Sequence, residues 1–232
     1  MNKVAVLIPC YNEEKTISEV VAEYKAALPD STVYVYDNNS SDNTYNVAKE
    51  AGAIVRREEY QGKGNVIRRM FADIEADAYL LVDGDMTYDS SVANLMINKL
   101  IDNKLDMVIC ARSEVSGSAY RLGHKFGNYF FTKTVGKIFG KKISDILTGY
   151  KALSRRFVKT FPVHGSGFDI EHEFTVHALE MRLPIAEITT EYFPRPDGSE
   201  SKLSTYKDGI KILFSIFKLT FTEKPLISFS IV

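Results

Sequence analysis

Short apolar runs alternate with longer amphipathic segments along the first half of the chain. The runs are rich in Val, Ile, Leu and Tyr, and they predict strands at 4–8, 32–36, 53–56, 79–82 and 107–110. Apolar residues recur at helical spacing between them, which predicts helices at 14–27, 42–51, 65–76 and 91–103. Apolar strands that alternate with helices indicate an α/β fold, in which helices flank a mostly parallel central sheet.

The second half of the chain has a less regular pattern. It predicts helices at 121–139 and 170–181, a strand at 184–192 and a polar loop at 194–202. Residues 208–222 combine a stripe of Ile, Leu and Phe with nearby lysines. Such a stripe packs into a core or lies in the headgroup zone of a membrane, and we favour the membrane surface. We therefore expect one domain over residues 1–203 and an amphipathic helical segment over 204–232.

Composition and charge narrow the class of protein. Lys plus Arg number 29 and Asp plus Glu 30, so the net charge of −1 gives no reason to expect nucleic acid as a partner. Two cysteines, Cys10 and Cys110, fit a reducing compartment better than a disulfide-stapled secreted domain. No stretch reaches the roughly 20 apolar residues of a membrane span. The apolar end after Lys224 is consistent with either a short tail or the first turns of a membrane helix.

An Asp-Gly-Asp sequence, residues 83–85, follows the predicted strand at 79–82. Two carboxylates at the end of a strand can divide their work, because one can bind a hard cation while the other reaches a sugar hydroxyl. Mg²⁺ and Mn²⁺ prefer such oxygen ligands and complete their coordination with phosphates and water. An acidic turn is the alternative, since Asp-Gly pairs are common in turns. The position at a strand end favours a function.

Two further polar segments follow predicted strands, at 9–13 and at 37–42. Ligands bind at the carboxyl ends of parallel strands, so these segments belong to the same predicted site. Neither carries the glycine pattern of a dinucleotide fold, and Gly62-Lys63-Gly64 is too short for a phosphate-binding P-loop. As alternatives, 37–42 is a helix-capping turn and 62–64 a flexible helix entry.

Taken in order, these motifs resemble the family-2 glycosyltransferases with the GT-A fold. The resemblance rests on Pro9-x-Tyr-Asn-Glu13, Asp37-Asn-x-Ser-x-Asp-x-Thr44, Gly62-Lys-Gly64 and Asp83-x-Asp85. The second half resembles the dolichol-phosphate mannose synthase-like branch, whose acceptor is a polyprenyl phosphate. That likeness rests on Arg112, Arg121, Asp145-x-x-Thr-Gly-Tyr150, Gly167-Phe-x-x-Glu171 and Arg195-x-x-Gly-x-x-Ser-Lys-Leu203. The match covers nearly the whole chain, from about residue 4 to residue 203.

The resemblance implies a role for each matching position. The positions that hold the donor nucleotide are Pro9, Tyr11, Glu13, Asp37, Lys63 and Asp83, and Asp85 is the ligand of Mg²⁺ or Mn²⁺. The basic groups that handle the donor and acceptor phosphates are Arg112, Arg121, Arg195 and Lys202. The chain departs from the common pattern at Asn38, Thr87 and Lys151. These departures weaken the assignment of mannose as the sugar more than the assignment of the chemistry.

We therefore expect an inverting enzyme that moves a hexose from a nucleotide sugar, UDP-glucose or UDP-GlcNAc, to a polyprenyl phosphate. An acceptor phosphate is already ionised, so it needs positioning and charge screening more than a general base. The expected place is the cytoplasmic face of the membrane, with a membrane protein or a second copy as a partner. One alternative is a hydroxyl acceptor, for which Glu171 or Asp169 would be the base. The other is a binding protein that keeps the nucleotide-sugar site without turnover.

Overall fold

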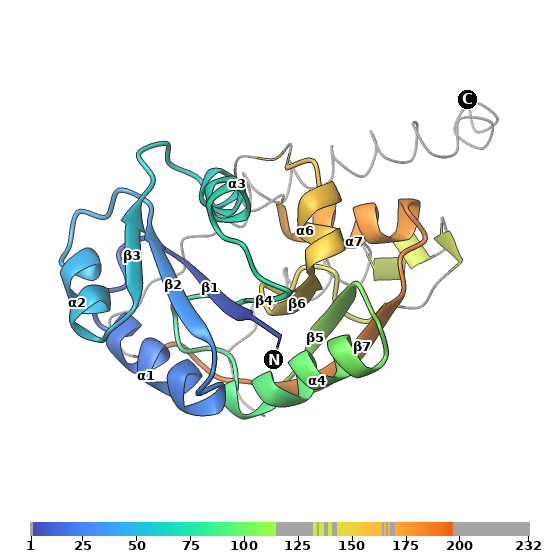
Figure 1. The fold of residues 1–232 in the computed structure, drawn as a ribbon, viewed down its shortest axis with the longest axis horizontal. Helices are drawn as coiled ribbons and strands as arrows, with labels where there is room; N and C mark the ends of the chain where they lie inside the picture. The colour runs from blue at the N-terminus through green and yellow to red at the C-terminus, as the bar shows by residue number, and fades with distance from the viewer. Residues whose placement is uncertain are drawn as a thin grey trace.

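The computed structural model of the chain describes residues 2–114, 132–133, 135–136, 139–140, 143–163, 165, 167 and 170–196. Seven strands form one sheet in the order β3-β2-β1-β4-β6-β5-β7 (Figure 1). Strand β6 runs antiparallel to both β4 and β5, whereas the other described pairs are parallel. The strands are β1 (Val4–Cys10), β2 (Thr32–Asp37), β3 (Ile54–Arg57), β4 (Ala78–Leu81), β5 (Met107–Glu114), β6 (Lys151–Ser154) and β7 (Ile185–Tyr192).

Helices cover both faces of the sheet (Figure 1). Helices α3, α6 and α7 lie on one face, and α1 and α4 lie on the other, with α2 beside α1. The α-helices are α1 (Ile17–Ala27), α2 (Thr44–Glu50), α3 (Lys63–Asp73), α4 (Ala93–Asp102), α6 (Arg155–Thr160) and α7 (Ile170–Glu180). A short 3₁₀ turn, η1 (Ser90–Val92), leads into α4, and the Asp89 side chain caps it by accepting a hydrogen bond from Ser91 N.

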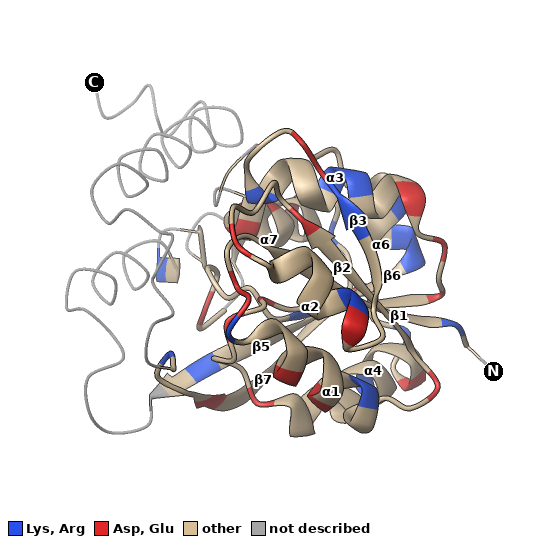
Figure 2. Ribbon diagram, turned by 90° about the vertical axis from the view of Figure 1, so that its left-hand side faces the viewer, with Lys and Arg blue, Asp and Glu red and all other residues tan. Residues whose placement is uncertain are grey.

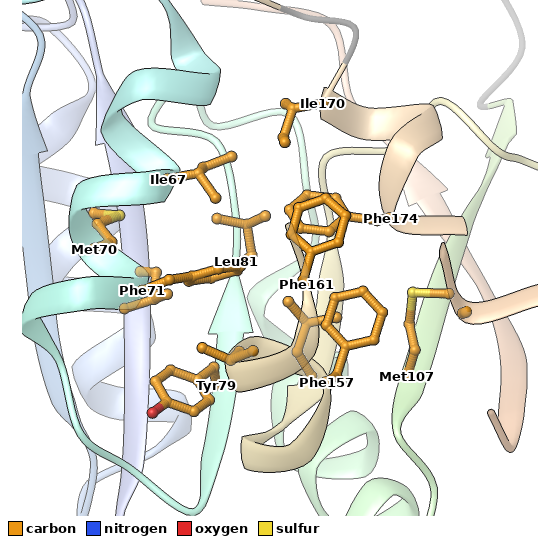
Figure 3. Packing of buried hydrophobic residues seen from close by; sticks show 14 of the residues in the cluster. Ile67, Met70, Phe71, Tyr79, Leu81, Met107, Phe157, Phe161, Ile170 and Phe174 are labelled. Carbon is orange, nitrogen blue, oxygen red and sulfur yellow. The ribbon is translucent and has the colours of Figure 1, made fainter. Parts of the chain in front are cut away.

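The apolar runs form strands because both faces of the sheet are buried. In β1, Leu7 packs toward α3, α6 and α7, while its neighbour Ile8 packs toward α1 and α4. Figure 3 shows the first of these two cores, where the Phe161 and Phe174 rings pack at a tilt of 32° with their centroids 4.7 Å apart. Full burial of a leucine side chain stabilises the fold by about 1.5–3 kcal/mol, so a polar residue in place of Leu7 would disrupt the sheet at its centre.

The expected α/β fold is confirmed, with the strands and helices of the first half within about four residues of their predicted bounds. Two elements of the second half were not predicted, β6 and α6. The predicted helices at 121–139 and 208–222 lie outside the described residues apart from a few positions, and most of the polar loop at 194–202 does too. Within the described part, none of the helices has the length and apolar character that a bilayer crossing requires.

Basic side chains gather on α3 and α6, on the side of the molecule that Figure 2 labels with these helices. Acidic partners neutralise several of them. Arg69 lies 2.8 Å from Asp73, and Glu75 receives both Arg155 at 3.0 Å and Lys159 at 2.5 Å. These pairs are largely exposed, so each contributes little to stability.

Candidate functional site

The carboxyl ends of β1, β2 and β4 meet at one edge of the sheet. Cys10 at the end of β1 is in register with Asp37 at the end of β2, and Leu81 at the end of β4 is in register with Lys151. Because β6 is antiparallel, it brings its first residues, rather than its last, to this edge. Residues just before Lys151 therefore lie beside the Asp-Gly-Asp sequence.

Hydrogen bonds join the loops after β1 and β2 into one wall of the site. The Asn12 backbone N–H donates to Ser40 Oγ at 2.9 Å, and Ser41 N donates to Asn12 Oδ1 at 2.8 Å. Glu13 N donates to Thr44 Oγ1 at 2.8 Å. Asn12 adopts a left-handed conformation with φ of 52°, which asparagine tolerates better than most residues. The two loops are therefore fixed relative to each other.

This wall carries the first four residues predicted to hold the nucleotide. Asp37 is fully buried, accepts hydrogen bonds from Ser40 N and lies 3.3 Å from Arg57 Nε. Pro9 and Glu13 are buried, whereas the Tyr11 side chain is exposed at the rim. A buried carboxylate at the end of β2 could accept hydrogen bonds from a ribose, and an exposed aromatic ring could stack on a base.

Asn38 connects this wall to the loop at 58–62. Its side-chain amide donates to the carbonyl oxygens of Glu58 at 3.1 Å and Tyr60 at 2.8 Å, and Asn38 Oδ1 accepts from Gly62 N at 2.7 Å. An aspartate could make only the last of these bonds, because a carboxylate has no N–H to donate. The departure from the common family residue therefore has a structural reason. Gly62, with φ of 129°, is the N-cap of α3, and Lys63 is the first residue of that helix.

Asp83 and Asp85 differ in their surroundings. Asp83 forms an ion pair with Lys63, and Asp85 lies 2.5 Å from Arg195 Nη2. Asp85 Oδ1 also accepts from Thr87 Oγ1 at 2.6 Å. Burial and then the neighbouring Asp83 carboxylate raise the pKa of Asp85. Burial acts the same way on Asp83, but Lys63 together with Arg195 and Arg112 outweighs it, so the pKa of that carboxyl is lowered.

The donor set at Asp85 fits a divalent cation whose other ligands come from substrate. Within the described residues there is no group of three or more His, Cys, Asp or Glu side chains that could hold a metal by itself. A cation bound at Asp85 would need phosphate oxygens and water to complete its coordination, as is usual for Mg²⁺. In the structure Arg195 already supplies a positive charge to Asp85 Oδ2. The Asp85 carboxylate can therefore interact with a positive charge at this position.

Gly149 allows Asp83 to approach the backbone at the entry to β6. A Cβ atom on Gly149 would lie 2.9 Å from Asp83 Cγ, closer than real Cβ contacts come. Gly149 N donates to the buried Tyr88 hydroxyl at 2.8 Å, and the Tyr88 ring packs against Tyr150. The Thr-Gly-Tyr segment thus has a structural role, since it seats one side of the Asp83 carboxylate.

Arg112 holds Asp145 with both arms of its guanidinium. Nε donates to Asp145 Oδ2 at 2.6 Å and Nη2 donates to Asp145 Oδ1 at 2.9 Å. The guanidinium also lies over the Tyr192 ring, 5.4 Å from its centroid. Such a bidentate pair fixes the position of Arg112 at the end of the sheet, where its charge also acts on Asp83.

The structure brings together most of the residues predicted from the sequence. Asp83, Asp85, Lys63 and Arg195 form one electrostatic cluster, and the charge of Arg112 also acts on Asp83. Asp37 pairs with Arg57 instead. Arg121, Lys202 and Asp169 lie outside the described residues. Sequence reasoning missed the contributions of Asn38, Gly149 and Lys151 to this cluster. The one signal for Asn38 and Lys151 was that each departs from the common family residue.

Comparison with known proteins agrees with this geometry. The model of glycosyl transferase family 2 matches residues 5–161. Glycosyltransferase AglJ of Haloferax volcanii is 33% identical over 97% of this chain and 75% of its own. Dolichol-phosphate mannosyltransferase of Pyrococcus furiosus is 27% identical over 99% of this chain and 68% of its own.

A solved structure shares the fold at low sequence identity. It is glucosyl-3-phosphoglycerate synthase of Mycobacterium tuberculosis in complex with Mn²⁺, UDP-glucose and phosphoglyceric acid, with a TM-score of 0.76 and 18% identity. The alignment covers 94% of this chain and 79% of that one. This likeness supports the GT-A architecture of the sheet. With the family match over more than half of its length, the chain belongs to glycosyl transferase family 2 and is a glycosyltransferase.

Proposed function

We propose that the enzyme transfers a hexose from a UDP-sugar, UDP-glucose or UDP-GlcNAc, to a polyprenyl phosphate and inverts the anomeric centre. One observation carries the proposal. Five carboxylates near the strand ends have basic partners, and they are Asp37, Asp83, Asp85, Asp145 and Glu171. A carboxylate held by a cation is a poor proton acceptor. An acceptor that is already ionised, such as a phosphate, needs no such base.

Glu171 illustrates the point, because a hydroxyl acceptor would call on it as the base. The Glu171 side chain is 6% exposed and lies between two lysines. Oε1 contacts Lys63, and Oε2 is 3.2 Å from Lys151 Nζ. This carboxylate is therefore engaged on both oxygens and shielded from solvent, which favours the phosphate acceptor over the hydroxyl acceptor.

The proposed mechanism divides the work among the residues at the sheet edge. The wall formed by the loops after β1 and β2 would hold the base and ribose, and Asp83 would orient the nucleotide. Asp85 would hold Mg²⁺ or Mn²⁺, which supplies charge neutralisation of the diphosphate leaving group. Arg195 would move from Asp85 to a phosphate, since a guanidinium fork binds two phosphate oxygens. Attack by the acceptor phosphate oxygen on the anomeric carbon, in line with the leaving diphosphate, inverts that centre.

Two features support action at a membrane surface. The relative from Pyrococcus furiosus is named for transfer to dolichol phosphate, and it aligns with nearly the whole of this chain. The sequence at 208–222 has the apolar stripe and lysines of an interfacial helix, and it lies outside the described residues. We propose the cytoplasmic face of the membrane as the place of the reaction, because nucleotide sugars and the ionised lipid headgroup meet there.

A donor screen tests the proposal. Purified protein is incubated with polyprenyl phosphate, Mn²⁺ or Mg²⁺ and each of several UDP- and GDP-sugars, and the lipid product is identified by mass. We expect a hexosyl-phosphate lipid with one UDP-sugar and none after replacement Asp85→Ala. A product on a hydroxyl acceptor, without any lipid-linked sugar, would refute the acceptor that we propose. The variant Asp102→Ala is a matched control, because Asp102 is exposed at the last position of α4.

A further inference from the structure

Four charged side chains form a network of alternating sign beneath the Asp-Gly-Asp sequence. Asp83 contacts Lys63, Lys63 contacts Glu171, and Glu171 Oε2 lies 3.2 Å from Lys151 Nζ. They come from the end of β4, the start of α3, α7 and β6. Lys63 and Glu171 are 9% and 6% exposed and Lys151 is fully buried. The four charges sum to zero.

Burial makes each of these charges dependent on its neighbours. An ion buried without a partner costs several kcal/mol, so the removal of one member leaves another uncompensated. Lys151 forms an ion pair with Glu171 and also donates a hydrogen bond to the Thr148 carbonyl oxygen. Burial lowers the pKa of Lys151, and the Glu171 carboxylate counteracts part of this lowering. The ammonium of Lys151 is therefore kept charged mainly by Glu171.

This network of charges holds Asp83 from two sides. On one side, the Glu171 carboxylate attracts the Lys63 ammonium and holds it in a fixed position next to Asp83 Oδ1. On the other side Lys151 fixes the Thr148 carbonyl, and the next residue, Gly149, is the one whose backbone seats the Asp83 carboxylate. Glu171 connects both sides, because one of its oxygens serves each lysine.

Simple stabilisation does not account for this arrangement. Buried ion pairs can often be replaced by apolar residues of similar size with no loss of stability, so four buried charges are not needed to close a core. An apolar residue could pack in place of Lys151, because its surroundings include the ring of Phe174 of α7. The ring centroid lies 5.6 Å from Lys151 Nζ. Charges arranged to end on a donor-binding carboxylate are better explained by positioning.

We propose that Glu171 and Lys151 are positioning residues for the donor: through Lys63 and Gly149 they fix the Asp83 carboxylate where it meets the nucleotide. This inference rests on the proposed function of Asp83. It assigns Glu171 a function other than that of a catalytic base. It also explains why a lysine is buried at position 151. Neither side chain needs to touch the substrate.

The test measures UDP binding in the full chain by calorimetry with Mn²⁺ present and no acceptor. We expect Glu171→Gln to weaken UDP binding about ten- to one-hundredfold, the size of one hydrogen bond to a charged group. Glu173→Gln is the matched control on the same helix, because Glu173 accepts from Gly165 N and its amide analogue keeps that acceptor. This control should bind UDP as the parent does. In turnover, Glu171→Gln should raise the KM for the donor while kcat changes little.

A double variant separates positioning from stability. Glu171→Gln with Lys151→Met removes one charge of each sign, so it should melt closer to the parent than either single variant does. Under our proposal its UDP affinity stays reduced, because nothing draws Lys63 into position. Parent-like UDP affinity in the double variant would overturn the proposal, and this holds even where Glu171→Gln alone does not fold. Failure of the parent to bind any UDP compound would instead refute the proposed function.

Discussion

Replacement of Asn38 by aspartate tests whether this residue has the structural role that its contacts indicate. The change preserves the shape of the side chain and removes both hydrogen bonds that the Asn38 amide donates, to Glu58 O at 3.1 Å and Tyr60 O at 2.8 Å. It also places a carboxylate against these two carbonyl oxygens. The bond from Gly62 N to Oδ1 remains available. Asn38→Asp should therefore loosen the loop at 58–62 from β2.

The size of the effect follows from the two bonds. Each neutral hydrogen bond contributes about 0.5–1.5 kcal/mol, and a buried carbonyl left without a donor adds to the loss. Tyr60 is exposed, so water can reach its carbonyl, and this keeps the total near the lower end. We expect the free energy of unfolding to fall by about 2 kcal/mol. At a slope of about 2 kcal/mol per molar urea, the midpoint would move down by about 1 M.

Urea unfolding followed by circular dichroism measures this shift, and tyrosine fluorescence provides a second probe because the chain has no tryptophan. Asn94→Asp is the matched control, since Asn94 is exposed in the first turn of α4 and uses its oxygen to accept from Asn98. This variant should remain within about 0.5 kcal/mol of the parent. An Asn38→Asp midpoint equal to that of the control would refute the assigned role of the amide.

Three further predictions concern other parts of the site and core. Gly149→Ala should destabilise the chain by about 1–3 kcal/mol and weaken UDP binding, because the new methyl group displaces Asp83; unfolding and UDP titration check this, and a parent-like affinity would contradict it. Arg112→Lys should lower the free energy of unfolding by about 1.5–3 kcal/mol, since an ammonium cannot make both bonds to Asp145; an unchanged urea midpoint would argue against it. Burial raises the pKa of Cys110 to about 12, so its thiol should react with an aromatic disulfide reagent at pH 8 only after unfolding, and equal rates in native and unfolded protein would exclude this.

The fold of the first half could be predicted because each element carries its own local pattern. Strand β1 is a continuous apolar run that ends in polar residues, and α3 has apolar residues at helical spacing. Strand β6 has no comparable signal. It has four residues, begins with Lys151 and passes directly into Arg155 of α6, so its sequence resembles a polar turn. A charged residue in a buried strand is explained only by Glu171, which lies on another element.

The candidate site was partly predictable for the same reason. Asp37, Asp83 and Asp85 follow apolar strands, and parallel strands bring their carboxyl ends to one edge. The sequence offers no means of knowing that Arg195 contacts Asp85, because that contact depends on where β7 ends relative to the turn after β4. Long-range ion pairs of this kind are set by tertiary packing, and the residues that make them have no mutual spacing in the chain.

The placement of β6 also has a consequence for how the chain folds. In the sheet, β6 stands between β4 and β5, although it follows both in sequence. Strand β4 therefore cannot complete its backbone pairing until about 40 more residues have been synthesised after β5, and β5, which also pairs with β7, must wait longer; contacts at such separation form slowly. During that interval β4 and β5 both present an open edge, which is the kind of surface that pairs with other chains. The nascent protein should be most prone to aggregate just before Lys151–Ser154 leaves the ribosome, and chaperones should act at that stage.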